Sequence, residues 1–332
     1  MAGGASGSNQ SAMPRVTVVI PNFNHGGFLE KRVLSVLNQT YQDFEVIYLD
    51  DASTDDSDQV IGKHLSDSRI RVFSNEANSG SPFKQWNKGV QLAKGEYVWI
   101  AESDDYADNR FLATLVRVLD DNPTVGLAYC QSIRVDEEDC VVTAIEEFLR
   151  GEGHWSKNFV NDGREECRRY LASRNTIPNA SAVLIRRRVY EDVSYADETM
   201  RLCGDWLMWI KILLVSDIAF VAEPLNYYRT NANSVRYKNS DRGTYHEEAY
   251  RVVRYAMEQM NIPTETLEET CQTLAGGWVS SIARRRTLRP WRQTRNIYRN
   301  ASEVDHRLKS RLIKNVASTI AQSFWPAGGS SV

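Results

Sequence analysis

The sequence has few cysteines, and their arrangement argues against two common structural devices. Five cysteines are scattered through 332 residues, with no C-x-x-C spacing. A disulfide framework or a zinc site needs paired or closely spaced cysteines, so these thiols are expected to be reduced, as in the cytosol. No run of eighteen apolar residues is present, so no segment is expected to span a membrane. The 40 basic and 43 acidic residues leave a net charge of −3, which gives no argument for a nucleic-acid partner.

Two glycine-rich phosphate-binding motifs are also missing. A dinucleotide-binding fold needs G-x-G-x-x-G after its first strand, and a P-loop needs G-x-x-x-x-G-K-[ST]. The turn at residues 21–28 reads PNFNHGGF and matches neither, so dehydrogenase and NTPase functions lose their main support. The Gly/Ser-rich start lacks the apolar core of a signal peptide. We expect residues 1–13 to be a disordered leader or tag, and residues 327–332 a disordered tail.

The most informative segment is 97–105, YVWIAESDD, in which a short apolar run ends in a cluster of carboxylates. The β-branched and aromatic run after Gly95 is typical of a buried strand in a parallel sheet. Ligands of open α/β sheets bind at the carboxyl ends of the strands. Clustered carboxylates repel one another, and a shared Mg²⁺ or Mn²⁺ ion would relieve that repulsion. Taken alone, the segment favours a solvated acidic loop that caps the next helix, and the rest of the chain reverses this preference.

Strands and helices alternate through most of the chain. This alternation predicts an α/β fold with a doubly wound, mostly parallel sheet flanked by helices. From about residue 241 only helical patterns remain, which predicts a C-terminal helical extension. The segment 140–164 has no clear pattern and is expected to be an irregular loop. We expect strands at 15–21, 44–49, 69–73, 97–101, 125–135, 181–187 and 218–228, and helices at 28–37, 83–93, 110–121 and 206–215.

Five short motifs occur in a specific order. They are Pro21-Asn22-Phe23-Asn24, Asp50-Asp51-Ala52-Ser53-Thr54-Asp55, Asn87-Lys88-Gly89, Glu102-Ser103-Asp104-Asp105 after Gly95-Glu96-Tyr97, and Gly204-Asp205. Their order and spacing over residues 15–234 resemble the family 2 inverting glycosyltransferases with the GT-A fold, of the kind that builds bacterial surface polysaccharides. No single motif is decisive, and the resemblance rests on the whole set.

The resemblance implies a role for each matching residue. Asp51 matches the carboxylate that accepts a hydrogen bond from the imide of uracil or thymine, and Asp205 matches the general base. The residues assigned to the nucleotide are Pro21, Asn22, Asn24, Asp50, Asp51, Asn78, Lys84, Asn87, Asp104 and Arg229. Those assigned to the Mn²⁺ or Mg²⁺ ion are Glu102, Asp104 and Asp105. Structural alternatives stay open, in which Asp51 is a turn residue and Asp205 is the N-cap of the helix at 206–215.

Three positions depart from the family pattern. Glu102 stands where the metal motif usually has Asp. The segment 84–87, KQWN, lacks the arginine that commonly precedes its Asn, although Lys84 remains as a phosphate contact. Asn231 stands where many relatives have a histidine, which favours Arg229 as the diphosphate contact over a histidine metal ligand.

The expected activity is transfer of a sugar from a UDP- or dTDP-linked donor to a glycan or lipid-linked glycan acceptor. We expect a catalytic domain at 14–238, with a nucleotide-binding half at 14–106 and an acceptor half at 107–238. A helical region at 239–326 follows. Two other functions stay open, a sugar-phosphate nucleotidylyltransferase and a non-catalytic nucleotide-sugar binding module. The first needs a basic glycine-rich loop after the first strand, which PNFNHGG does not supply.

The helical region is rich in basic residues and tryptophan. Between residues 278 and 314 there are eleven arginines and lysines, and Trp278, Trp291 and Trp325 occur in the same region. Basic helices with an apolar face can lie on an anionic membrane surface. The sequence therefore leaves three interpretations open, which are peripheral contact with the inner face of the cell membrane, a homodimer contact and a solvated face of a cytoplasmic enzyme.

Overall fold

A computed structural model describes residues 13–144, 153–177, 179–230, 243–283 and 291–324. The predicted leader before Met13, the tail, Asn231, Trp325 and the basic residues at 284–289 lie outside this part of the chain. Within it, ten strands form one sheet with the order β3-β2-β1-β4-β9-β6-β10-β5, and β7 and β8 pair with β6 and β10. The strands are β1 (Val16–Asn22), β2 (Phe44–Asp50), β3 (Ile70–Ser74), β4 (Tyr97–Ile100), β5 (Tyr106–Ala107), β6 (Val125–Val135), β7 (Val141–Ala144), β8 (Phe159–Asn161), β9 (Val183–Arg186) and β10 (Asp217–Arg229).

The first half of the sheet is parallel, and the second half is mixed. Strand β1 pairs in parallel with both β2 and β4, and β2 pairs in parallel with β3. Strand β9 then runs antiparallel between β4 and β6. The α/β class and the expected strands are confirmed, but the parallel arrangement extends only to β4 and to the β6–β10 pair. The segment predicted to be an irregular loop contains β7, β8 and a 3-10 turn at Gly153–Ser156.

Helices cover both faces of this sheet, because the strand side chains alternate between two apolar clusters. Val18 and Ile20 pack with residues of α1, α2 and α4, whereas Val19 packs with residues of α3 and α7. This alternation follows from the period of two in an extended strand. The helices of this part are α1 (Gly26–Leu37), α2 (Ser57–Gly62), α3 (Pro82–Leu92), α4 (Phe111–Asp121), α5 (Gly163–Glu166), α6 (Arg187–Asp192) and α7 (Gly204–Leu213), and a π-helical turn occupies Cys167–Leu171.

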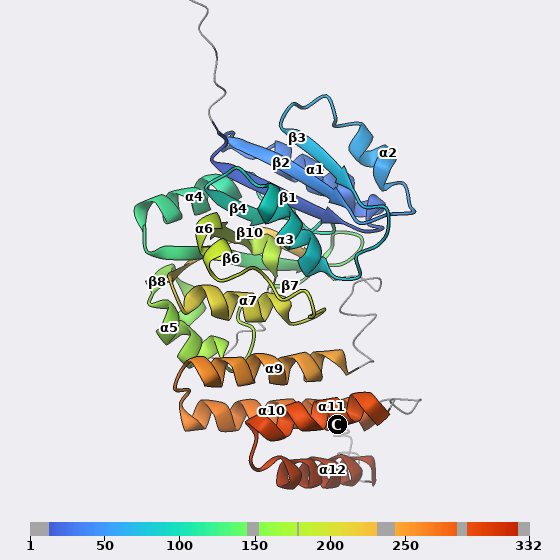
Figure 1. The fold of residues 1–332 in the computed structure, drawn as a ribbon, viewed down its shortest axis with the longest axis vertical. Coiled ribbons are helices and arrows are strands. Elements are labelled where there is room, and N and C mark those ends of the chain that lie inside the picture. The colour runs from blue at the N-terminus through green and yellow to red at the C-terminus, as the bar shows by residue number, and fades with distance from the viewer. Residues whose placement is uncertain (1–12, 145–152, 178, 231–242, 284–290, 325–332) are drawn as a thin grey trace, which may run out of the picture.

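Four helices extend the molecule away from the sheet, stacked below α7 in Figure 1. They are α9 (Thr244–Gln259), α10 (Thr264–Ala283), α11 (Trp291–Val304) and α12 (Leu308–Phe324). Tyr250 of α9, Trp278 of α10 and Ile297 of α11 belong to the same buried cluster as the sheet residues on that face. The predicted C-terminal helical region is therefore packed continuously onto the sheet. No helix in the described ranges is both long and apolar enough to cross a membrane.

Candidate active site

A cavity of about 510 Å³ opens where β1, β2 and β4 end. The parallel pairing brings the segments after these three strands to one edge of the sheet, as expected for an open α/β fold. Of the predicted site residues, Pro21, Asn22, Asn24, Asp51, Asn78 and Glu102 line this cavity, together with Phe23, His25, Gly80, Ser81, Pro82, Gln85, Ser103 and Arg201. The other predicted residues lie outside its lining.

Asp51, directly after β2, is buried and its carboxylate is surrounded by donors. It accepts hydrogen bonds from Asn75 Nδ2 at 2.6 Å, Gln85 Nε2 at 2.8 Å and Ser79 Oγ at 2.8 Å. The backbone N–H of Ser79 donates to both of its oxygens. These neutral donors stabilise the charged carboxylate at the cavity wall. They also tie β2 to the loop before α3, so Asp51 has a structural role whatever it binds.

Two buried acceptor atoms in the cavity lining lack a partner in the described chain, namely Asn22 Oδ1 and Gln85 Oε1. The amide nitrogen of Asn22 is fully used, because it donates to Asp50, Ser53 and Ser57. A buried polar atom without a partner costs stability, so such atoms often face a ligand or water. Both residues line the cavity, but the two oxygens themselves have almost no accessible surface, so they are unsatisfied acceptors within its wall and are not already open to a ligand.

Three further predicted nucleotide-binding residues shape the loops around the cavity. Asp50 is buried and accepts hydrogen bonds from Ser53 N and Asn22 Nδ2 at 2.8 and 3.2 Å. Asn24 adopts a left-handed φ of 56°, and its Oδ1 accepts from Thr54 N at 2.7 Å. Asn78 Oδ1 accepts from Gly80 N at 2.8 Å. Each of these side chains closes a turn, which holds the cavity wall in one shape.

The three carboxylates after β4 lie in a different environment. Burial raises the pKa of Glu102 to about 8, with a contribution from Asp104, while a hydrogen bond from Trp86 Nε1 at 2.7 Å opposes the shift. Burial and Asp104 likewise raise the pKa of Asp105 to about 7. Burial is the larger cause of both shifts and the neighbouring Asp104 adds to it, so loss of hydration and like charge both disfavour the charged carboxylates. Within the described ranges no three side chains converge into a ready-made metal cage.

Arg229, predicted to contact the diphosphate, is buried beside this cluster and outside the cavity lining. Its Nε donates to Asp104 O at 2.8 Å, its Nη1 to Asp136 O at 2.5 Å, and its Nη2 to the Asp139 carboxylate. Its backbone N–H donates to Asp105 Oδ1 at 2.8 Å. In this structure the guanidinium is therefore engaged in holding the acidic loop against the end of β10.

Lys84 and Asn87 of α3 also lie outside the cavity lining. Lys84 is exposed and donates to Ser79 O at 3.1 Å. Asn87 is buried and its amide is fully used, since it donates to Ala196 O and accepts from Tyr190 OH, both at 3.0 Å. Asn87 thus holds the segment that leads to α7.

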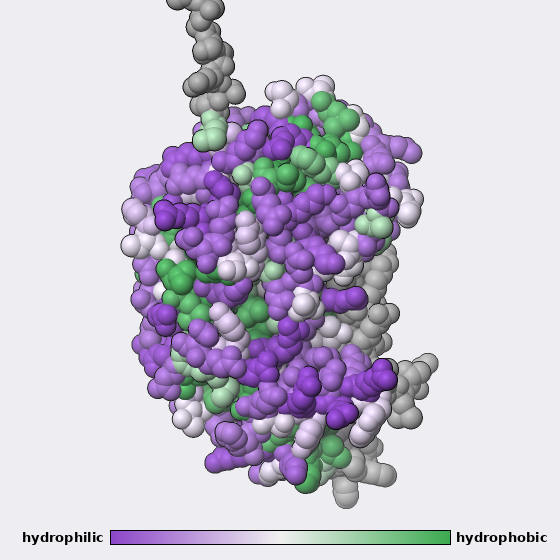
Figure 2. Space-filling model, viewed as in Figure 1, coloured by the Kyte–Doolittle hydropathy of each residue, from purple (hydrophilic) through white to green (hydrophobic). Residues whose placement is uncertain are grey.

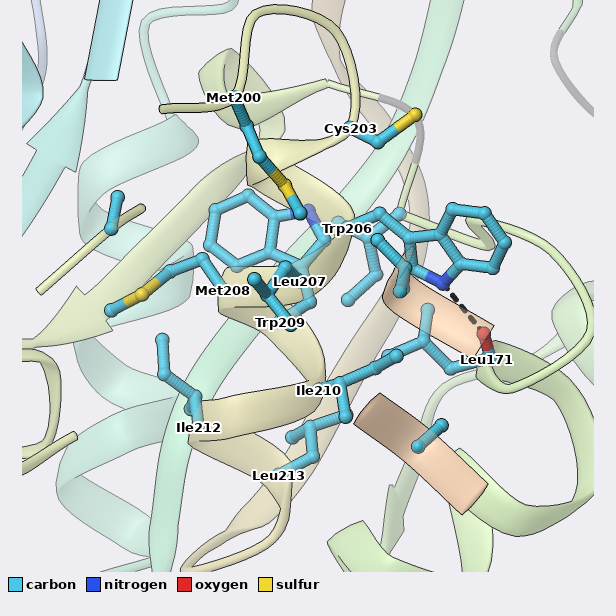
Figure 3. Close-up of a cluster of buried hydrophobic side chains, with 14 of the residues drawn as sticks. Leu171, Met200, Cys203, Trp206, Leu207, Met208, Trp209, Ile210, Ile212 and Leu213 are labelled. Carbon is cyan, nitrogen blue, oxygen red and sulfur yellow. Dashed lines mark hydrogen bonds between the residues drawn. The ribbon is translucent and has the colours of Figure 1, made fainter. Parts of the chain in front are cut away.

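Asp205 lies in the first turn of α7, which is anchored in the core by its apolar residues. Figure 3 shows Trp206 and Trp209 among the buried side chains of this helix, and Trp206 Nε1 donates to Leu171 O at 2.6 Å. The N-cap position belongs to Cys203, so the alternative interpretation of Asp205 as the N-cap is wrong. Asp205 Oδ2 accepts from Asn175 Nδ2 at 3.0 Å, and Oδ1 accepts from Trp206 N at 2.7 Å. The carboxylate is therefore held at the start of a rigid helix.

Comparison with known proteins identifies the family. The model of glycosyl transferase family 2 matches residues 17–194, which is more than half of the chain. The chain belongs to this family. The matched range includes β1 to β9 and the cavity-lining residues other than Arg201, whereas Asp205 and Arg229 lie beyond it.

Two relatives and one solved structure show the range of similarity. Glycosyltransferase GlyG of Streptococcus pneumoniae is 28% identical over 66% of this chain and 72% of its own. The GalNAc(5)-diNAcBac-PP-undecaprenol beta-1,3-glucosyltransferase of Campylobacter jejuni is 30% identical over 46% of this chain and 45% of its own. Staphylococcus aureus TarS 1–349, crystallised with UDP-GlcNAc, has a TM-score of 0.66 at 18% identity, over 94% of this chain and 92% of that one. The likeness to TarS shows that the fold is GT-A.

Two arginines of this glycosyltransferase site are absent from the sequence predictions, namely Arg201 of the cavity lining and Arg32 of α1. Arg32 of α1 is fully buried beneath the carboxylates, and burial lowers its pKa to about 10. Its Nε donates to Glu102 O at 2.8 Å and its Nη2 to Ser181 Oγ at 3.1 Å. A signal was available, because Arg32 occupies the apolar face of α1 between Leu29 and Val33, where a charged residue is exceptional.

Proposed function

We propose that this glycosyltransferase transfers a sugar, with inversion, from a UDP- or dTDP-linked donor to a glycan or lipid-linked glycan acceptor in polysaccharide biosynthesis. The observation that carries the proposal is the cavity at the strand ends. It combines a buried carboxylate, two acceptors without partners in the described chain and the start of the acidic loop. Membership of family 2 and the GT-A fold supply the reaction class.

The nucleoside is proposed to occupy the part of the cavity lined by Asn22 and Asp51. A pyrimidine imide N–H and the ribose hydroxyls are donors, and the cavity is lined by the Asp51 carboxylate and the side-chain amides of Asn22 and Gln85, which carry acceptor oxygens. TarS is solved with UDP-GlcNAc and binds a uridine nucleotide, which supports a pyrimidine donor here. A hydrogen bond to a charged group contributes about 1.5–3 kcal/mol, so Asp51 would supply much of the base recognition.

Mn²⁺ or Mg²⁺ is proposed to be held by Asp104 and Asp105, with Glu102 beside them. The donor set is all oxygen, and the raised pKa values of Glu102 and Asp105 come first from burial and then from Asp104, so a divalent cation would stabilise the charged carboxylates. When bound, such an ion stabilises the negative charge of the leaving nucleoside diphosphate. Arg229 holds the loop that carries both aspartates, through Asp104 O and Asp105 Oδ1.

Asp205 is proposed to take the proton of the acceptor hydroxyl while that oxygen attacks the anomeric carbon. One step then forms the new C–O bond and breaks the bond to the diphosphate, which inverts the configuration. The hydrogen bond from Asn175 Nδ2 to Asp205 Oδ2 holds the carboxylate in one orientation, which orients the base. A positioned general base contributes about 10²–10⁴-fold to the rate.

The acceptor proposal includes contact with the inner face of the cell membrane. On α12, Ile313 is 70% exposed and lies among Lys309, Lys314 and the half-exposed Val316. On α11, Trp291 is 77% exposed. Another basic residue of this region, Arg311, instead forms ion pairs with Glu268 and Asp305 of the same chain. Figure 2 shows a mainly hydrophilic face with an apolar patch at its lower end, over the C-terminal helices.

The same surface is compatible with a homodimer contact. Sedimentation with anionic vesicles distinguishes membrane contact from dimer formation. Removal of the whole helical region would expose buried apolar residues of α7, which contacts α9 and belongs to the same cluster, so point variants are the better probe. Salt-sensitive binding by the wild-type chain, lost in Ile313→Glu, supports membrane contact. A dimer in solution that Ile313→Glu dissociates, without vesicle binding, supports the alternative.

The function itself is tested by release of nucleoside diphosphate from a panel of UDP-, dTDP- and GDP-sugars. A family 2 transferase slowly hydrolyses or transfers from its own donor and releases UDP or dTDP. A nucleotidylyltransferase would instead consume a nucleoside triphosphate and release pyrophosphate. A binding module would bind the sugar nucleotide and release nothing, and either result would overturn the proposal.

A further inference from the structure

Arg201 is the single lysine or arginine among the described residues that line the cavity. Its side chain is exposed, and it makes no ion pair or hydrogen bond with the described chain. The other cations near the site are differently placed. Arg32 and Arg229 are buried and engaged with the acidic loop, and Lys84 donates to Ser79 O. Arg201 therefore supplies the guanidinium that faces the cavity.

The backbone on both sides of Arg201 is held in place, which fixes the point at the cavity wall from which its side chain extends. Met200 and Cys203 are buried, and Met200 O accepts from Ser81 Oγ at 3.2 Å. Ser81 is the N-cap of α3 and lines the same cavity. With its neighbours turned into the core, Arg201 is left to project into the cavity beside a helix N-terminus, whose partial positive charge also favours an anion.

A carboxylate from the C-terminal helices holds this segment in place. Glu248 of α9 is buried, and its Oε1 accepts from Arg201 N at 2.8 Å. Its Oε2 accepts from Leu202 N at 2.8 Å and Cys203 N at 2.9 Å. Three charge-assisted hydrogen bonds to successive amides make Glu248 the main support of the turn before α7. Helix α9 makes a second contact with this region, in which Arg251 Nη2 donates to Asp197 Oδ2 at 3.0 Å.

We propose that Arg201 binds the diphosphate of the donor and that Glu248 is the positioning residue that presents it. The proposal rests on the proposed function, because it assumes that a nucleoside diphosphate occupies the cavity. A guanidinium suits this ligand, since its planar set of donors can form paired hydrogen bonds with phosphate oxygens. The C-terminal helices thereby become part of the donor site.

The first test compares UDP with uridine by calorimetry, using the full chain in buffer with Mn²⁺, and repeats the comparison with dTDP and thymidine. Arg201→Met keeps an unbranched, flexible stem and removes the charged guanidinium. We expect the diphosphate to bind at least about tenfold more weakly, with nucleoside binding unchanged. Arg188→Met, an exposed arginine of α6, is the matched control and should bind both ligands as the wild type does.

The outcomes separate this inference from the function on which it rests. If the wild type binds UDP or dTDP and Arg201→Met binds it equally well, the inference is wrong and the proposed function survives. Equal weakening of nucleoside and diphosphate would show a general loss of the cavity and would also overturn the inference. If the wild type binds neither diphosphate, the proposed function and this inference are overturned together.

The second test addresses Glu248. Glu248→Gln replaces one acceptor oxygen by an N–H₂ group that faces backbone donors, and Glu248→Asp keeps the charge but withdraws it from the turn. Variants that melt like the wild type are expected to weaken UDP binding about as much as Arg201→Met does, without further loss in the double variant. Glu258→Gln, an exposed carboxylate of the same helix, is the control. Unchanged UDP binding in both folded variants, or full additivity, would overturn the positioning role.

Discussion

Two acidic loops flank β1, one after β2 and one after β4, and their environments differ. Asp51 in the first loop is buried among neutral donors from Asn75, Ser79 and Gln85. In the second loop Glu102 is half-buried and Asp105 is buried, both beside Asp104, and their pKa values are raised to about 8 and about 7. Both loops follow short buried strands and have similar sequences, DDASTD and ESDD.

The difference shows how a protein uses the same side chain in two ways. A carboxylate with its own donors, such as Asp51, is a preformed acceptor that those donors hold in one orientation. A carboxylate beside like charges is strained until a cation or a proton neutralises it. The first loop is therefore suited to recognise a neutral base, and the second to hold a metal ion. Three predictions distinguish base recognition by the first loop from metal binding by the second, and a fourth, on Asp205, concerns the catalytic base.

The largest effect is expected in the loop after β4. Asp105→Ala should lower transfer by about 10³-fold or more, because the charge of the leaving diphosphate loses several kcal/mol of stabilisation. EDTA should do the same to the wild type, and Mn²⁺ or Mg²⁺ should restore the wild type alone. Initial rates of UDP release measure both, with Asp121→Ala on the surface of α4 as the control. Full activity in EDTA would remove the metal from the mechanism.

Asp205 lies in neither loop, and its loss should change the rate without changing donor binding. We expect Asp205→Asn to lower kcat at least about 10²-fold, because amide nitrogen and oxygen cannot accept the acceptor proton. The dissociation constant for UDP should stay within about twofold of the wild type, as it should in Asp192→Asn. Normal turnover in the variant would show that another group is the base.

In the loop after β2, the expected effect is on binding. Asp51→Ala should weaken UDP and dTDP alike by about 10–100-fold, the equivalent of a charged hydrogen bond of about 1.5–3 kcal/mol. Thermal unfolding of Asp51→Ala is needed beside calorimetry, because the carboxylate also holds Ser79 and Asn75. Asp58→Ala, an exposed carboxylate after the same loop, should leave both constants unchanged. An unaltered affinity in Asp51→Ala would reduce this residue to a structural role.

The smallest effect concerns stability and pH in the metal-free protein. Glu102 has a raised pKa, so the folded state binds more protons than the unfolded state between about pH 5 and about pH 8. Stability therefore falls as pH rises through this range, and the melting temperature in EDTA should fall by a few degrees. Glu102→Gln should flatten this dependence. A melting temperature that rises with pH equally in both proteins would contradict the proposed repulsion.

The sequence was sufficient to predict the strand ends and the residues that follow them. Pro21, Asn22, Asp51 and Glu102 were placed at the carboxyl ends of buried strands, and the structure brings all four to one cavity. This succeeded because a short apolar strand followed by polar residues is a local signal, and parallel pairing then aligns the ends.

Contacts between distant segments could not be predicted in the same way. Nothing near Glu248 in the sequence indicates that it accepts from the amides of residues 201–203, because that contact depends on how α9 packs on the fold. Arg229 was assigned to the diphosphate from a motif, and only the structure shows its bonds to Asp104 and Asp136. The sequence of β9, VLIR, likewise does not indicate that this strand runs antiparallel to β4.

That inverted strand has a consequence for the order in which the chain can fold. Strands β1 to β4 have their partners close in the sequence, whereas the partners β9 and β10 of β6 follow much later in the chain. Until these are synthesised, β6, an eleven-residue strand buried along most of its length, has only β7 to pair with near its end and presents unpaired edges elsewhere. Such edges are sites of intermolecular pairing in partly folded chains. Pulse-labelled hydrogen exchange during refolding should therefore protect the amides of β1 and β2 before those of β6, and aggregation should compete with the step in which β9 docks.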